Sequence, residues 1–182
     1  MVSAGRRATS RAHLAALAAA VLACGCGPKR PAEPVGVSQT SGPLSGKPVP
    51  FAFDSIDERK VSSEAARGKI CVLAFVTTGD LASQAQLSYL REMHKHDGEQ
   101  VTYAMVALHE RRARDMVEAY VSALKLPFPA ALADPIGMNE KGPFGEIHTV
   151  PTTIVIDREG RLVFKKSGLV KAEELRGVMR GL

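Results

Sequence analysis

The sequence of 182 residues contains no tryptophan, three cysteines, and aromatic residues that make up 5% of the chain. Three cysteines are too few for the dense disulfide framework of a small secreted domain. The apolar run at residues 14–23 is too short for a membrane-spanning helix, which needs roughly 20 apolar residues. With 45% hydrophobic and 24% charged residues, the composition is globular and excludes a chain that is disordered throughout.

Positive charge is concentrated near the N-terminus. The formal net charge is +5, and Arg6, Arg7 and Arg11 lie in a stretch without acidic residues. The rest of the sequence is close to neutral and lacks the clustered basic residues that nucleic-acid binders carry on a folded domain. A basic segment followed by a short apolar run is typical of a secretory signal. We therefore expect an exported protein without a nucleic-acid partner.

Cys24 directly follows the apolar run and is preceded by Val21, Leu22 and Ala23. This arrangement resembles a bacterial lipobox, which implies a signal peptide over residues 1–23 and a lipid on Cys24. The alternatives are Cys26, which lacks the aliphatic residue three positions earlier, and a plain cleavable signal. Gly25 stands where Asp commonly retains lipoproteins at the inner membrane, so the outer membrane is favoured. We predict a lipid-anchored protein of the cell envelope that faces the periplasm.

Residues 24–48 are rich in Pro, Gly and Ser and show no hydrophobic periodicity, which predicts a flexible tether. Residues 49–182 remain as one domain, long enough for a real hydrophobic core. The continuous apolar runs at residues 70–76 and 101–108 are typical of strands buried on both faces. Residues 153–164 predict a β-hairpin with Gly160 in its turn.

Three further segments are expected to form helices: 80–96, 110–124 and 171–181. Leu81 is the first apolar position of the first helix. Strands that alternate with helices and end in an antiparallel hairpin predict the α/β class. The expected architecture is a central mixed sheet with helices on both faces.

Three segments resemble the TlpA/ResA-type branch of the thioredoxin fold: residues 68–75 (GKICVLAF), 126–129 (LPFP) and 150–163 (VPTTIVIDREGRLV). The resemblance covers residues 49–182 and implies a thioredoxin-like fold with a cis Val150–Pro151 bond. Active members of this branch are thiol-disulfide oxidoreductases with a Cys-x-x-Cys at the start of the first helix. Asp80 and Ser83 stand at those two positions. Because dithiol exchange needs a thiolate and a resolving thiol, the resemblance implies a site without the family's chemistry.

Other residues offer little alternative chemistry. Asp80 is expected to cap the first helix. Cys71 lies in an apolar run and is expected to be an inert core residue. His94 and His96 are two residues apart and fall on different helix faces, which argues against metal ligation. The sequence therefore predicts neither a metal site nor a cofactor, and His148 is expected on the loop before Pro151.

Two functions from different classes are consistent with these observations. The first is a redox-inactive thioredoxin-like lipoprotein that binds extracytoplasmic protein or peptide as an adaptor or chaperone-like factor. Its groove would be formed by the following residues: Thr78, Gly79, Asp80, Val150 and Pro151. The second is a thiol-disulfide oxidoreductase acting through a single cysteine, Cys71 or Cys26. A carrier of a ligand or metal is a third interpretation.

Overall fold

The computed structural model describes residues 44–138 and 142–182. The predicted signal peptide, the lipidation site Cys24 and most of the tether lie outside these residues, as does Cys26. Within the described residues, no helix combines the length and the apolar character needed to cross a membrane.

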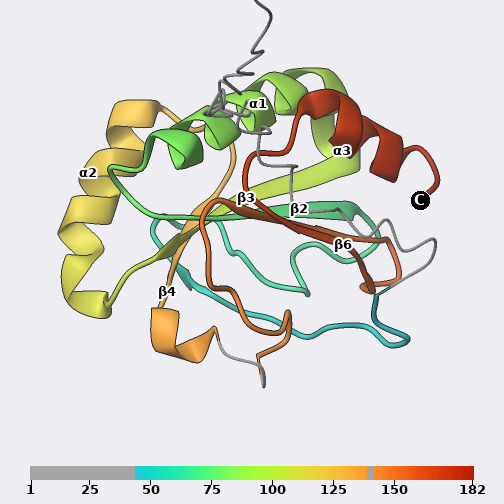
Figure 1. Cartoon of the computed structure of the whole chain (residues 1–182), viewed down its shortest axis with the longest axis horizontal. Helices are drawn as coiled ribbons and strands as arrows, with labels where there is room; N and C mark the ends of the chain where they lie inside the picture. Colours follow the sequence, from blue (N-terminus) through green and yellow to red (C-terminus); the bar gives the residue numbers. More distant parts are fainter. Residues whose placement is uncertain (1–43, 139–141) are drawn as a thin grey trace, which may run out of the picture. The chain divides into compact units, whose positions relative to one another are not determined.

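The described part forms a mixed six-stranded sheet in the order β1-β4-β3-β2-β5-β6, with three α-helices (Figure 1). The strands are β1 (Asp54–Ser55), β2 (Ile70–Val76), β3 (Val101–Leu108), β4 (Ala130–Ala133), β5 (Thr152–Ile156) and β6 (Leu162–Ser167). The helices are α1 (Leu81–Asp97), α2 (Arg114–Leu124) and α3 (Ala172–Met179), with the short 3-10 helices η1 (Gly98–Gln100), η2 (Arg111–Ala113) and η3 (Pro135–Gly137). This arrangement confirms the predicted α/β class and the mixed sheet.

The central strand is β2, which pairs in parallel with β3 and antiparallel with β5. All of its residues are buried. Alternate side chains point to opposite faces of a strand, so β2 contributes to two hydrophobic clusters. Val72 and Ala74 belong to the cluster on one face, whereas Cys71, Leu73 and Phe75 belong to the cluster on the other.

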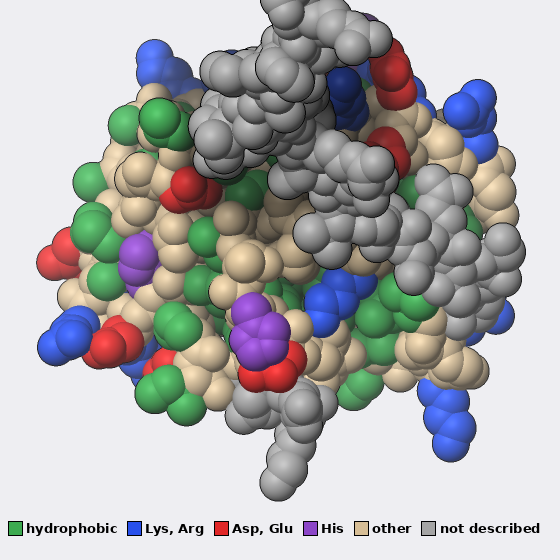
Figure 2. Space-filling view, in the orientation of Figure 1, with side chains coloured by type: hydrophobic (Ala, Val, Ile, Leu, Met, Phe, Trp, Pro, Cys, Tyr) green, Lys and Arg blue, Asp and Glu red, His purple; other side chains and the backbone are tan. Residues whose placement is uncertain are grey.

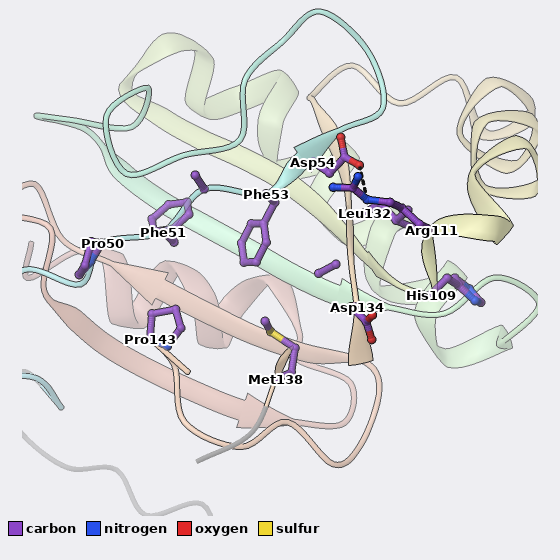
Figure 3. Close-up of a pocket in the computed structure, with 12 residues that line it drawn as sticks. Pro50, Phe51, Phe53, Asp54, His109, Arg111, Leu132, Asp134, Met138 and Pro143 are labelled. Atoms are coloured by element: carbon purple, nitrogen blue, oxygen red, sulfur yellow. Dashed lines mark ion pairs between the residues drawn. The ribbon is translucent and has the colours of Figure 1, made fainter. Parts of the chain in front are cut away.

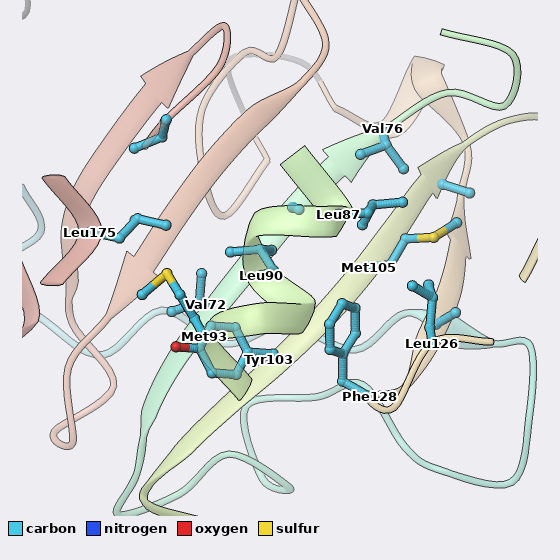
Figure 4. Close-up of a cluster of buried hydrophobic side chains, with 14 of the residues drawn as sticks. Val72, Val76, Leu87, Leu90, Met93, Tyr103, Met105, Leu126, Phe128 and Leu175 are labelled. Atoms are coloured by element: carbon cyan, nitrogen blue, oxygen red, sulfur yellow. The ribbon is translucent and has the colours of Figure 1, made fainter. Parts of the chain in front are cut away.

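The helix-side cluster lies on the face that the three α-helices cover (Figure 4). Its main members are Val72, Leu87, Leu90, Met93, Tyr103, Met105, Val117, Phe128 and Leu175. The loop-side cluster lies on the opposite face, and its main members are Val49, Phe51, Cys71, Leu73, Phe75, Val106, Phe144 and Ile154. In Figure 1, α1 and α3 lie above the sheet and loop segments lie below it.

The expectation of helices on both faces was therefore wrong for the described residues, because all three α-helices pack on the helix-side face and loop segments cover the other. The loop-side face is covered by the segment from Val49 to Ala66 and by residues around Phe144, with the 3-10 helix η3 nearby. The connections β2-α1-β3 and β3-α2-β4 step in the same direction across the sheet. Because such parallel crossovers share one handedness, they place both helices on the same face.

The start of α1 differs from its predicted amphipathic pattern. Leu81 is 80% exposed, whereas Ser83 and Gln86 are fully buried. Gln86 can be buried because its side-chain amide forms hydrogen bonds with both the N–H and the carbonyl of Val170. Val170 N–H donates to Gln86 Oε1 at 2.7 Å, and Gln86 Nε2 donates to the Val170 carbonyl at 3.2 Å. This pair joins α1 to the segment before α3.

Two strands and one helix start were not predicted. The strand β4 has the sequence Ala-Ala-Leu-Ala, and alanine has low strand propensity. It forms because the edge of β3 accepts it in parallel register and all four of its residues become buried. The strand β1 has two residues, and the segment predicted as helix 110–124 begins with η2 before α2 starts at Arg114.

We predict stability effects of very different size for two leucines of the same helix. Leu90→Ala should lower the free energy of unfolding by about 2–5 kcal/mol, because it leaves a cavity in the helix-side cluster. Leu81→Ala, at the exposed position, should change it by less than about 0.5 kcal/mol. Urea unfolding followed by circular dichroism measures both. Equal losses in the two variants would contradict the placement of α1.

Candidate functional site

The loop between β2 and α1 contains Thr78, Gly79 and Asp80, three residues of the predicted groove. Gly79 has a φ of 83°, a left-handed conformation that glycine adopts without steric cost. Asp80 is the N-cap of α1, and its carboxylate accepts a hydrogen bond from Ser83 N–H at 2.7 Å. The predicted helix cap is therefore confirmed.

The environment of Asp80 favours its charged form. Hydrogen bonds from Ser83 lower the pKa of the Asp80 carboxyl below its usual range. The positive end of the α1 macrodipole acts in the same direction. Ser83, one turn into the helix, is fully buried. The start of α1 thus carries a fixed negative charge and a buried hydroxyl, and neither group can act as the attacking or resolving thiol of disulfide exchange.

His109 also belongs to this site, and the sequence analysis did not select it. Thr78 N–H donates to His109 Nε2 at 3.0 Å, and Thr78 Oγ1 lies 3.1 Å from the same nitrogen. Met116 of α2 lies beside them, with its Sδ 3.7 Å from Thr78 Oγ1. Because Nε2 accepts an N–H bond, it carries its lone pair, and the ring proton of the neutral imidazole is on Nδ1.

The strand register explains why Thr78 meets His109. Val76 pairs with Ala107 at the ends of β2 and β3, and each of the two site residues lies two positions further along its chain. The same reasoning applies to β4, where Leu108 pairs with Ala133, so His109 is level with Asp134. A histidine directly after the second of two parallel buried strands is the signal that could have identified it.

Val150 and Pro151 lie at the same end of the sheet. Thr152 pairs with Phe75, so the two residues before β5 are level with the chain that leaves β2 toward Thr78. The Val150–Pro151 peptide bond is cis. Among the described residues, the backbone N–H and C=O of Val150 have no hydrogen-bond partner. The topology therefore brings the predicted groove residues to one end of the sheet, with an unpaired peptide group at its border.

A cavity of about 430 Å³ adjoins His109 on the loop-side face (Figure 3). Phe51, Phe53 and Met138 form apolar parts of its wall. Asp54 lies opposite Arg111, with 3.7 Å between the carboxylate and Nε, and the pair is drawn as a dashed line in Figure 3. His109 thus lies at the edge of this cavity, and in Figure 3 its ring points away from the middle of the cavity.

Cys71 is located far from this site. It is 2% exposed, faces the loop-side cluster, and lies near the start of β2 rather than its end. About five residues of extended strand, or roughly 16 Å, separate it from the carboxyl end of β2. Burial raises the pKa of the Cys71 thiol to about 12. The predicted burial of Cys71 in the core is confirmed.

Within residues 44–138 and 142–182, the other histidines and the basic residues form no second site. His148 is exposed and lies 2.9 Å from Glu146. In the part of the chain that the structure describes, no group of three His, Cys, Asp or Glu residues could hold a metal ion. On the face shown in Figure 2, Lys and Arg side chains are scattered among acidic and apolar ones.

Comparison with known proteins agrees with this geometry. The chain has a thioredoxin-like fold: it superposes on a DsbF homologue from Corynebacterium diphtheriae with a TM-score of 0.65 at 19% identity, covering 75% of this chain and 86% of that one. It also superposes on the exposed lipoprotein thioredoxin Etrx1 of Streptococcus pneumoniae with a TM-score of 0.62 at 20% identity, covering 73% of this chain and 99% of that one.

The sequence itself is similar to thiol-disulfide oxidoreductases of the ResA type. It is 26% identical over 142 residues to the thiol-disulfide oxidoreductase ResA of Bacillus cereus, which covers 74% of this chain and 76% of the relative. No protein-family model matches the chain. These relatives agree with the resemblance that the segments at residues 68–75 and 150–163 indicated.

We predict that Asp80→Ala lowers the urea midpoint of unfolding at neutral pH, because Ser83 N–H loses its acceptor. The sign follows from the lowered pKa of Asp80. Its contribution is fully present above the unfolded-state pKa of about 3.9 and is lost as pH falls through the folded-state value. The difference between wild type and variant should therefore shrink on acidification.

Asp80→Ser is the matched control, because serine keeps a capping oxygen without a charge. It should retain part of the stability and show a weaker pH dependence. A wild-type-like midpoint for Asp80→Ala at neutral pH would contradict the role of Asp80 as a cap.

Proposed function

We propose that this protein is a membrane-tethered, extracytoplasmic thioredoxin-like binding protein that captures an extended protein segment without dithiol exchange. The observation that carries the proposal is the start of α1, where Asp80 caps the helix and Ser83 is buried. In this function, the thioredoxin-like framework would bind its partner non-covalently and not through a mixed disulfide.

The unpaired peptide group of Val150 supports binding by strand addition. An extended segment can donate to the Val150 carbonyl and accept from its N–H, and such main-chain pairing provides affinity without dependence on sequence. The groove border also exposes apolar surface, because Leu81 is 80% and Met116 is 47% exposed. Leu81 directly follows Asp80 and Met116 contacts Thr78, so these exposed apolar side chains are suited to a segment that carries apolar residues itself.

The tether and the lipid anchor are inferred from the sequence. The lipobox-like residues before Cys24 and the Pro-, Gly- and Ser-rich segment to residue 48 support a protein held close to its membrane. Similarity to an exposed lipoprotein thioredoxin of Streptococcus pneumoniae supports an envelope location. A binding site on such a tether would sample partners within a few nanometres of the membrane surface.

The alternative function is a thiol-disulfide oxidoreductase, as the name of the Bacillus cereus relative suggests. It would require Cys71 or Cys26 to act with a resolving thiol from elsewhere. The buried position of Cys71 and its raised pKa oppose this role, because the thiolate is the nucleophile in thiol exchange. The binding function therefore agrees better with the site.

A disulfide-reduction assay on the full-length chain separates the two functions. With insulin as substrate and dithiothreitol as reductant, we expect wild type and Cys71→Ser to match the uncatalysed rate. Asp80→Cys/Ser83→Cys should raise the rate, because it places two thiols at the start of α1, where the dipole lowers the pKa of a thiol. Turnover by wild type that Cys71→Ser abolishes would contradict the proposal.

Site-specific photo-crosslinking tests the binding function itself. A photoreactive amino acid is placed at Thr149, which is exposed beside Val150, or at Glu99, which is exposed beyond the other end of α1. The probe is reduced, carboxymethylated α-lactalbumin, an unfolded protein without free thiols. We expect crosslinks from position 149 that exceed those from position 99. Equal yields from the two positions would contradict a groove at this end of the sheet.

A further inference from the structure

We infer that His109 is a positioning residue for the groove: its neutral imidazole holds the Thr78–Asp80 loop, and protonation of the ring releases that loop. This inference rests on the proposed binding function, because it concerns control of the same groove. Its structural basis is the pair of contacts that Thr78 makes to one ring nitrogen, at 3.0 Å from the backbone N and 3.1 Å from Oγ1.

The backbone contact makes the arrangement sensitive to charge. An imidazole nitrogen can accept the Thr78 N–H only through its lone pair, and a protonated ring has N–H donors at both nitrogens. Protonation would therefore bring two N–H donors, those of Nε2 and of the Thr78 backbone, to face each other. The Thr78 amide would lose its acceptor, and the Nε2 N–H would donate to the Thr78 hydroxyl oxygen instead. The contact that fixes the backbone before Gly79 exists in the neutral state alone.

The His109 side chain is half-buried. The charged groups near it are largely paired with one another. Arg111 of η2 and Asp54 of β1 line the cavity that His109 borders and contact each other at 3.7 Å. Asp54 also contacts Arg114 at 3.3 Å. Asp134, at the end of β4, lines the cavity and accepts a hydrogen bond from Ile136 N–H at 2.9 Å. Toward α2 the neighbour is the uncharged Met116.

The direction of the pH effect follows from burial. Burial lowers the pKa of His109 below its ordinary value of about 6.5. As pH falls, the unfolded chain takes up this proton before the native protein does, so the contribution of His109 to stability is present above about pH 6.5 and is lost below it. The groove loop should accordingly be held at neutral pH and released in acid, as pH falls through the lowered folded-state pKa of His109.

Nuclear magnetic resonance of the full-length protein in detergent tests the contact directly. We expect the Thr78 amide signal to shift with the titration of His109 between pH 8 and pH 4.5. The hydrogen exchange of this amide with solvent should be faster in acid than the intrinsic pH dependence of amide exchange predicts. His109→Gln places a neutral acceptor near Nε2, so its Thr78 amide should stay protected across the range. His109→Leu should lose that protection at every pH.

Binding of reduced, carboxymethylated α-lactalbumin at pH 7.5 and pH 5 gives the functional readout. Wild type should bind about fivefold more weakly at pH 5, the effect of one net hydrogen bond, whereas His109→Gln should bind equally at both values. His148→Gln is the matched control, because it removes an exposed histidine of the loop before Pro151 and should retain the wild-type pH dependence.

The outcomes separate this inference from the proposed function. A Thr78 amide that ignores both pH and His109→Leu would overturn the inference, as would wild-type binding that is equal at both pH values while the amide titrates. No binding by any variant, together with a Thr78 amide that titrates as expected, would contradict the proposed binding function and support the role of His109 in holding the loop.

Discussion

The position of β2 between a parallel and an antiparallel neighbour determines the geometry of the whole site. Parallel pairing with β3 makes residues beyond Val76 meet residues beyond Ala107, which brings Thr78 to His109. Antiparallel pairing with β5 brings the chain before Thr152 to the same end. A slip of one residue would turn every β2 side chain to the other face, and the two clusters leave no room for it.

The start of α1 shows how this fold separates stability from chemistry. Backbone N–H groups and the helix dipole favour any negative group at this position. At this position a thiol has a lowered pKa and is therefore reactive, whereas the carboxylate of Asp80 is stabilised as a charged helix cap. Neither the helix nor the sheet depends on a thiol at this position, so a chain with Asp80 and Ser83 there can form the same framework. The proposed binding function accordingly uses the framework of these relatives without their activity.

The sequence predicted the parts of the fold whose residues carry a strong pattern. The buried strands β2 and β3, the Asp80 cap and the burial of Cys71 follow from apolar runs and residue type. The strand β4 could not be predicted from alanines, which become strand residues because β3 offers them an edge. The exposure of Leu81 could not be predicted either, since polar residues, Ser83 and Gln86, occupy the buried positions at the start of α1.

His109 was missed for a different reason, because its significance depends on a neighbour far along the chain. A site without thiols also needs another way to end an encounter. In dithiol exchange a resolving thiol breaks the covalent bond to the substrate. In the proposed binding function, the affinity of the groove for an extended segment would itself have to change, and a conformational shift can change that affinity by no more than its differential effect on binding. The backbone hydrogen bond from Thr78 to the neutral imidazole of His109 is the contact proposed to provide a modest change of that kind.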